Sequence, residues 1–377
     1  MTHRERVLTA LKHQKPDRVP LDLGSQNSST ITAGAHQRLR AHLGIPPDPP
    51  PVVGSRWLST VIPDETILCR FDVDFRPLFL GRPDSRAERE LPDGSLLSEW
   101  GVPFVRHGES HYFPGEGPFC RLDEPGIENL EAHCWPDPAD PGRYRGLRER
   151  AKRLRENTDY AVVLNPGAGP VHVGQWLRGF GEWLTDLLVN PTFSEALADR
   201  ITDIWVEIVH RALQEAGEFV DIVCWGDDLG TQRGPQFSPE LYRRMIKPRQ
   251  KRMVEAIKRH GKLALYHTCG SVAGFLPDFI ELGIDAVNPV QVSAAGMDTQ
   301  RLKREFGRDI TFWGAIDTQT VLPRGTAEDV RSEVRHRIDE LGPGGGYVLC
   351  AVHNIQPEVP PENIVAMYEA ALEYGRG

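Results

Sequence analysis

Three residues with metal-binding side chains stand out in the second half of the sequence. His267 and Cys269 lie two positions apart in a Tyr-His-Thr-Cys-Gly segment, and Cys350 follows much later. Side chains two positions apart on a strand point to the same face, so His267 and Cys269 can reach one point. An imidazole and two thiolates suit Zn²⁺, and three protein ligands with an open fourth position are typical of catalytic zinc. The alternative is that all three side chains simply pack in the core.

The segments around these residues alternate between strand-length apolar runs and helical periodicity from residue 160 onward. The strands predicted from this pattern are Ala161–Leu164, Val220–Trp225, Leu263–His267, Ala286–Asn288, Ile310–Trp313 and Tyr347–Ala351. Such alternation indicates a parallel α/β sheet. Because the chain lacks a Gly-rich dinucleotide motif, a closed (β/α)₈ TIM barrel fits better than an open doubly wound sheet, which the pattern alone leaves possible.

Local signals place several other elements. Arg18–Leu23 is predicted to be a short strand, and the helices that follow Ser238 and Thr326 have good N-cap residues. Thr192 with Glu195 is interpreted as a capping box.

A segment rich in Pro and Gly precedes this regular pattern of strands and helices. Residues 80–145 contain short alternating runs, which suggest hairpins. We expect this segment to be an excursion near the barrel mouth and not a second domain, so that residues 1–377 form one barrel domain.

A barrel places its active site at the carboxyl ends of its strands. Several polar residues follow predicted strands there. Asp227 and Asp228 are candidates for a fourth ligand, a proton relay or a substrate contact. His353 is a candidate for a substitute ligand or an acid/base. Asn288 and Asp317 are candidate pocket residues. One aspartate serves equally well as a helix cap, and a satisfied loop histidine is the alternative for His353. His172 and Trp176, which follow Gly169-Pro170, are weaker candidates, and packing alone is the alternative for either.

Composition limits the partners. The chain of 377 residues has 44 basic and 53 acidic residues, a net charge of -9, without any Lys/Arg-rich run. Nucleic acid and anionic membranes are therefore poor partners. The charged segment 1–13 does not look like a signal peptide, and no apolar stretch approaches the roughly 20 residues of a membrane span. We expect a cytoplasmic protein with reduced cysteines.

The sequence resembles the uroporphyrinogen decarboxylase superfamily over essentially its whole length. The segments that carry the resemblance are Arg4–Val7 through Pro16–Pro20, Gly169-Pro170, Leu187–Pro191, Tyr266–Gly270 and Phe312–Asp317. The resemblance implies a (β/α)₈ barrel, in agreement with the pattern above.

One branch of this superfamily decarboxylates a tetrapyrrole without a metal and carries an arginine-bearing loop of the form R-Q-A-G-R soon after the first strand. The corresponding stretch here, Leu21–Ile31, contains no arginine. The resemblance therefore places Gln26, Asn27 and Ser28 as contacts to a more neutral substrate. Arginines elsewhere are the candidates to replace the loop, namely Arg56, Arg70 and Arg76.

The other branch comprises cobamide-dependent methyltransferases with an H-x-C…C zinc motif, which His267, Cys269 and Cys350 match. The resemblance implies a zinc-dependent methyltransferase that acts between a corrinoid and a small thiol, a folate or a methoxylated compound. The corrinoid would come on a partner protein, because the chain has no D-x-H-x-x-G motif. A homodimer is expected only by analogy.

Two alternatives stay open. The first is a metal-free decarboxylase of the uroporphyrinogen decarboxylase type. The second is a non-catalytic binding protein clipped by zinc, which would need a fourth protein ligand from Asp227, Asp228 or His353.

Overall fold

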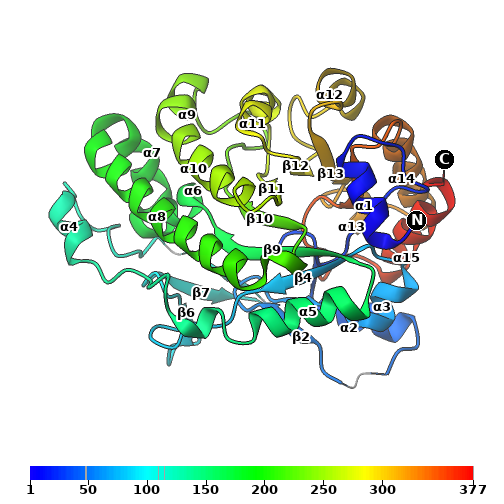
Figure 1. The fold of residues 1–377 in the computed structure, drawn as a ribbon, viewed down its shortest axis with the longest axis horizontal. Helices are drawn as coiled ribbons and strands as arrows, with labels where there is room; N and C mark the ends of the chain where they lie inside the picture. Colours follow the sequence, from blue (N-terminus) through cyan, green and yellow to red (C-terminus); the bar gives the residue numbers. More distant parts are fainter. Residues whose placement is uncertain (47–48, 109, 114, 377) are drawn as a thin grey trace.

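Parallel strands form the centre of the computed structural model, which describes residues 1–46, 49–108, 110–113 and 115–376 (Figure 1). The strands of the central sheet are β4 (Phe75–Phe79), β9 (Ala161–Ala168), β10 (Ile222–Gly226), β11 (Leu263–His267), β12 (Ala286–Val290), β13 (Thr311–Ile316) and β14 (Tyr347–Ala351). They pair in the order β14-β13-β12-β11-β10-β9-β4, and all of these pairs are parallel.

Residues 20–23 occupy the eighth position and close the sheet into a barrel. Leu21 forms a parallel bridge with Leu349 of β14, and the amide of Asp22 donates to the Leu349 carbonyl at 3.0 Å. On the other side, the amide of Asp74 donates to the Leu21 carbonyl at 2.9 Å. The predicted (β/α)₈ barrel is confirmed, although the predicted strand Arg18–Leu23 is reduced to the single bridge at Leu21.

Helices surround the barrel and alternate with its strands (Figure 1). They are α1 (His3–Leu11), α2 (Ala33–His42), α3 (Glu65–Arg70), α4 (Ile127–Ala132), α5 (Leu147–Asn157), α6 (Pro170–Arg178), α7 (Phe180–Val189), α8 (Pro191–Ala216), α9 (Pro239–Met245), α10 (Lys247–Lys258), α11 (Leu276–Leu282), α12 (Thr299–Phe306), α13 (Val321–Arg324), α14 (Ala327–Leu341) and α15 (Pro361–Tyr374). No helix in the described part of the chain combines the length and apolarity that a membrane crossing requires.

The cap residues confirm most of the predicted helix starts. The side chains of Ser238 and Thr326 cap α9 and α14 as expected. The predicted capping box of Thr192 and Glu195 is wrong, because α8 begins earlier. Its cap is Asn190, whose side chain accepts a hydrogen bond from the Phe193 amide.

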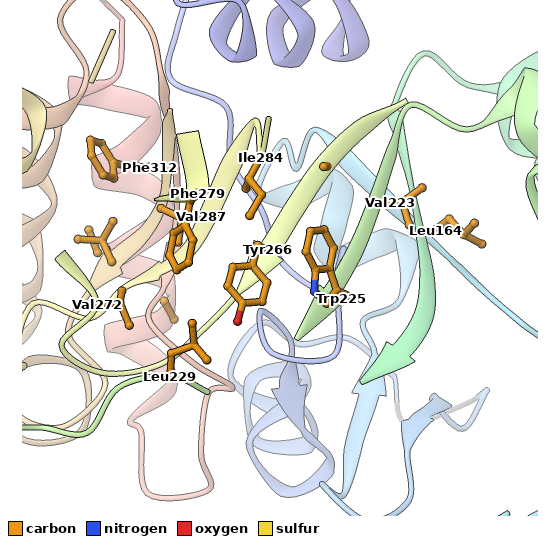
Figure 2. Packing of buried hydrophobic residues seen from close by; sticks show 14 of the residues in the cluster. Leu164, Val223, Trp225, Leu229, Tyr266, Val272, Phe279, Ile284, Val287 and Phe312 are labelled. Carbon is orange, nitrogen blue, oxygen red and sulfur yellow. The ribbon is translucent and has the colours of Figure 1, made fainter. Parts of the chain in front are cut away.

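Because side chains point alternately to the two faces of the strands, the buried residues form two layers, one between the strands and the helices and one inside the barrel. On the helix-covered side, Trp225 of β10 and Tyr266 of β11 stack with ring centroids 5.0 Å apart, and Phe279 of α11 meets Tyr266 edge-on (Figure 2). Inside the barrel, a second buried cluster includes Trp313 and Cys350. A cysteine in the middle of such a cluster is enclosed by apolar side chains.

Two small antiparallel sheets accompany the barrel. The first consists of β1 (Ile31–Thr32), β2 (Val52–Ser55) and β3 (Thr60–Ile62), and the second of β5 (Arg89–Glu90), β6 (Leu96–Leu97), β7 (Pro103–His107) and β8 (Ser110–Tyr112). The second sheet confirms the predicted hairpins within residues 80–145, of which Glu109 and Pro114 lie outside the described residues. In Figure 1 it lies to one side of the barrel strands.

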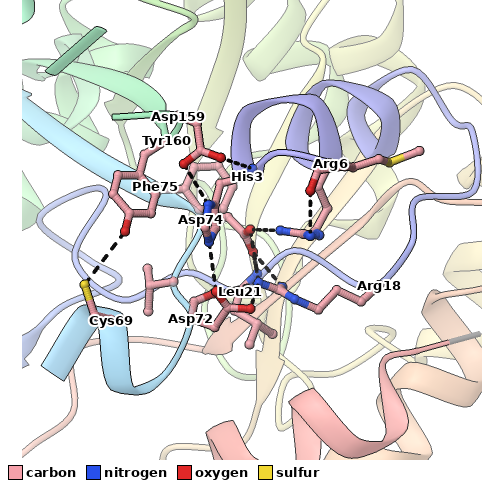
Figure 3. A network of polar contacts seen from close by, with 12 residues as sticks. His3, Arg6, Arg18, Leu21, Cys69, Asp72, Asp74, Phe75, Asp159 and Tyr160 are labelled. Atoms are coloured by element: carbon pink, nitrogen blue, oxygen red, sulfur yellow. Dashed lines mark hydrogen bonds and ion pairs between the residues drawn. The ribbon is translucent and has the colours of Figure 1, made fainter. Parts of the chain in front are cut away.

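A buried carboxylate ties the first barrel segment to its neighbours (Figure 3). Asp74, which is fully buried, accepts hydrogen bonds from Arg6 at 2.7 Å, from Arg18 at 2.8 Å and from the amide of Leu21 at 2.7 Å. Both guanidinium groups are themselves more than nine-tenths buried. Asp74 therefore joins α1 and the barrel-closing residues 20–23 to the start of β4.

We expect Asp74→Ala to lower the free energy of unfolding by about 3–5 kcal/mol, because it leaves two buried guanidinium groups without their carboxylate. The matched control is Asp72→Ala. The Asp72 side chain pairs with Arg18 and His3 but is 46% exposed, so its loss should cost at most about 1 kcal/mol. Urea unfolding measures both, and equal losses would contradict the assigned role of Asp74.

Candidate active site at the barrel mouth

Three metal-binding side chains meet at the carboxyl ends of β11 and β14. His267 is the last residue of β11, Cys269 follows it, and His353 follows β14. One ligand atom from each residue lies within 4.8 Å of the other two, and His267 Nε2 is 3.5 Å from Cys269 Sγ. These residues form the metal-competent group of the described chain and are called the mouth triad below.

Cys350 does not belong to the mouth triad. It is paired with Ala315 in the register of β13 and β14, and its side chain is fully buried inside the barrel. Its thiol donates to the Ala351 carbonyl at 3.2 Å. The predicted third ligand thus lies within the strand, whereas His353 lies beyond the end of the strand and reaches the mouth.

The environment keeps both triad imidazoles neutral. His267 Nδ1 donates to the Asn288 side-chain oxygen at 2.6 Å, which leaves Nε2 to face Cys269. Burial lowers the pKa of His267, and burial with the neighbouring His267 lowers the pKa of His353 to about 4. Burial, with the carboxylate of Asp228, raises the pKa of the Cys269 thiol. Neutral imidazole is the form that binds a metal.

Asp227, which directly follows β10, caps the start of helix α6. Its side chain accepts a hydrogen bond from the amide of His172 in the first turn of α6 at 2.9 Å. The second carboxylate oxygen is buried without a partner, and burial raises the pKa of Asp227 to about 7. Gly169 permits this approach, since a Cβ there would lie 2.2 Å from that oxygen. Of the roles predicted for Asp227, the structure places it as a helix cap.

Asp228, in contrast, faces the open side of the site. One of its oxygens accepts from the amide of Cys269 at 2.8 Å, and the other lies 3.4 Å from Nε2 of His172. Although burial opposes the charge, His172 holds the pKa of Asp228 well below its usual range. Asp228 therefore connects the loop that carries Cys269, called the triad loop below, to His172.

His172, one of the weaker candidates from the sequence, has a polar environment that packing alone would not need. Its Nδ1 donates to the Gly226 carbonyl at 3.3 Å, and its ring lies parallel to that of Trp176 with centroids 5.7 Å apart. Burial alone would lower its pKa, but the charge of Asp228 outweighs burial and raises the pKa to about 9. His172 is thus an imidazolium at neutral pH. Its position at the start of the helix after Gly169-Pro170 was the available signal.

A cavity of about 610 Å³ opens beside the mouth triad. The predicted substrate contacts Gln26, Asn27 and Ser28 all line it. The side-chain oxygen of Gln26 accepts the Cys224 thiol at 3.0 Å, while its Nε2 is buried without a partner. The excursion contributes further lining residues, which include Arg82, Glu99, Trp100 and Phe104.

Two predicted pocket residues have other tasks. Asn288 holds His267, as described above, and is fully buried behind it. Asp317 accepts from the amides of Gln319 at 2.8 Å and Thr320 at 3.2 Å, in the turn before α13. Neither is among the described residues that line the cavity.

The three arginines considered as replacements for an arginine loop are paired elsewhere. Arg56 pairs with Glu88 and Glu90, Arg70 with Glu369, and Arg76 with Glu65. None of the three lines the described cavity.

The model of the uroporphyrinogen decarboxylase (URO-D) family matches residues 109–374. The chain belongs to the uroporphyrinogen decarboxylase family. A uroporphyrinogen decarboxylase of Alkalilimnicola ehrlichii is 24% identical over 374 residues, which cover 97% of this chain and 93% of that protein. The methylcobamide:CoM methyltransferase MtbA of Methanosarcina mazei is 23% identical over 236 residues, which cover 62% of this chain and 65% of that protein.

The solved structure of a methyltransferase from Methanosarcina mazei has the same fold. It matches with a TM-score of 0.70 and 18% identity over 99% of each chain. This URO-D family member is thus similar both to decarboxylases and to methyltransferases, and the chemistry of the site has to distinguish the two.

In the metal-free protein we expect the His172 ring to titrate with a pKa near 9, and we expect Asp228→Asn to lower that pKa, because burial then loses its strongest opponent, the charge of Asp228. Since the folded pKa is raised, the stability that protonated His172 contributes is complete below pH 6.5 and is lost as the pH rises through 9. NMR titration of the ring, assigned with His172→Gln, measures this. Asp317→Asn is the control that should change nothing. A wild-type pKa at or below 6.5 would refute the ion pair.

Proposed function

We propose that this URO-D family member is a zinc-dependent methyltransferase that moves a methyl group between a corrinoid on a partner protein and a small thiol, folate or methoxylated compound. The observation that carries the proposal is the mouth triad, in which two neutral imidazoles and a thiol meet beside a cavity. The methyltransferase relatives support it at the level of the family.

The triad suits zinc in donor type and spacing. Zinc–nitrogen and zinc–sulfur bonds of usual length in a tetrahedron place the two donor atoms roughly 3.5 Å apart. The observed separation of His267 Nε2 and Cys269 Sγ is 3.5 Å. Among the described residues, no further His, Cys, Asp or Glu joins this group. Three protein ligands support a catalytic site with an open position over a closed structural clip.

Zinc bound there would supply a Lewis acid for the heteroatom that carries or receives the methyl group. Asn288 fixes the His267 ring, and Asp228 fixes the loop that carries Cys269. A reduced corrinoid on the partner protein would supply the electron pair for the new bond to the methyl carbon. The methyl–heteroatom bond would break with its electron pair left on the heteroatom, which would then take up one proton. His172, which lines the cavity and pairs through Nε2 with Asp228, is the residue that would supply this proton.

The cavity supports methyl transfer over decarboxylation of a polyacid. A substrate with several carboxylates needs unpaired cations, because a buried charge without a partner is costly. Here the lining cation Arg143 pairs with Glu99, and His172 pairs with Asp228. The remaining lining arginine, Arg82, is solvent exposed.

We expect about one zinc per purified, reduced chain, and we expect His267→Ala, Cys269→Ala and His353→Ala each to abolish stoichiometric binding. Cys350→Ser is the matched control and should retain zinc, because Cys350 lies inside the barrel. Asn288→Ala should weaken zinc binding about 10- to 100-fold through loss of the hydrogen bond to His267. Elemental analysis and competition with a chromogenic chelator measure these values.

Loss of zinc in Cys350→Ser but not in His353→Ala would contradict the triad. Zinc-loaded wild type should also demethylate methylcobalamin or methylate cob(I)alamin with a suitable co-substrate, and the three triad variants should not. A zinc-free wild type that decarboxylates a polyacid would overturn the proposed function.

A further inference from the structure

We infer that the methyl donor is an aryl methyl ether, whose ring packs against Trp57, Phe104 and Trp176 in the cavity. This inference rests on the proposed function and names the substrate class for that same site. It follows from the shape of one wall of the cavity, from the pairing of the lining carboxylates and from an unpartnered amide.

The three rings form one aromatic wall, although they come from distant parts of the chain. Trp57 lies between β2 and β3, Phe104 lies in β7 and Trp176 lies in α6. The ring of Trp176 stands nearly perpendicular to the other two, at 74° to Trp57 and 81° to Phe104, with centroids 5.7 and 5.5 Å away. All three line the cavity. A flat ring can therefore meet one face and one edge of this wall, which are the arrangements that aromatic pairs prefer.

The carboxylates of the lining are paired within the protein, and the remaining lining arginine, Arg82, is solvent exposed. The carboxylates all face cations, in the pairs Glu88–Arg56, Glu99–Arg143 and Asp228–His172. A thiol that carries an anionic group such as a sulfonate would have to displace one of these carboxylates or pair with the exposed Arg82, where solvent weakens the interaction. This pairing favours a neutral ligand that is mostly apolar.

An amide in the lining of the same cavity supplies a neutral polar contact. Gln26 is 2% exposed and lines the cavity, and its Nε2 has no hydrogen-bond partner, since its oxygen is engaged by Cys224. A buried N–H without a partner costs free energy, so a ligand oxygen there would be stabilised. A methoxy or phenolic oxygen accepts such a bond, whereas a thioether accepts it only weakly.

The wall lies close to the mouth triad. Trp176 stacks on His172, His172 faces Asp228, and Asp228 contacts the amide of Cys269. A ring against Trp176 thus places its ether oxygen near both the triad and the proton of His172. The O–CH₃ bond would break with its electron pair left on the oxygen, and a reduced corrinoid would supply the pair for the new bond to the methyl carbon. The phenolate would take the proton of His172 and leave as a phenol.

The test is binding of 2-methoxyphenol to the zinc-loaded protein without corrinoid, measured by calorimetry. Methoxycyclohexane, which has a similar shape without a π face, should bind at least about 3-fold more weakly. Trp57→Leu and Trp176→Leu should each weaken 2-methoxyphenol about 3- to 10-fold and leave methoxycyclohexane nearly unchanged. Trp176→Phe, which keeps a ring, should restore most of the affinity.

Trp135→Leu is the matched control, because Trp135 is equally half-buried but does not line the cavity. It should leave binding unchanged, and thermal unfolding of every variant separates lost contacts from lost folding. Equal binding of the two ethers, or tighter binding of 2-mercaptoethanesulfonate than of 2-methoxyphenol, would overturn the inference.

A second measurement separates this inference from the proposed function. Zinc-loaded protein is mixed with cob(I)alamin and either 2-methoxyphenol or a methylated thiol. Ring-dependent binding without methyl transfer from either donor would refute the methyltransferase and keep the ligand class. Transfer from the methylated thiol alone would keep the methyltransferase and refute the aryl ether.

Discussion

The buried carboxylate of Asp74 is the constraint on which the barrel and its site depend. By accepting from Arg6, Arg18 and the Leu21 amide, it holds residues 20–23 beside β4. That placement makes the last strand, β14, a neighbour of the first segment and closes the ring. Because β11 to β14 are parallel neighbours in the sheet, their carboxyl ends share one edge, and in the closed ring that edge surrounds the opening where the mouth triad lies.

Local sequence was sufficient for the strands that are continuous apolar runs. Leu263–His267 and Tyr347–Ala351 were predicted with their observed bounds, because each is a short, mostly apolar run that a polar or glycine residue precedes. Phe75–Phe79 was not predicted, since Arg76 and Pro77 interrupt its apolar run. Residues 20–23, which close the barrel, resemble a strand in sequence, but they make a single bridge to β14 and a hydrogen bond from the Asp74 amide on the other side, instead of a ladder.

In the candidate site too, some contacts follow from the local sequence and others depend on the tertiary structure. His267 and Cys269 share a short spacing within one strand end, so their meeting could be predicted. The choice between Cys350 and His353 depends on where β14 leaves the barrel, which sequence does not mark. Trp57 and Phe104 reach the cavity only because two small sheets pack against the barrel. No periodicity in the sequence predicts that contact.

Two consecutive aspartates show how the fold divides chemical roles between identical side chains. Asp227 is enclosed at the start of α6, and burial raises its pKa to about 7, while Asp228 faces His172, which keeps it ionised. Neighbouring carboxyls with opposite environments are a common way to set acid and base roles. Here the ionised member holds the backbone of Cys269 with one oxygen and the proton of His172 with the other. Movement of the triad loop must therefore alter the ion pair of His172, so that ligand geometry and proton supply are linked through one carboxylate.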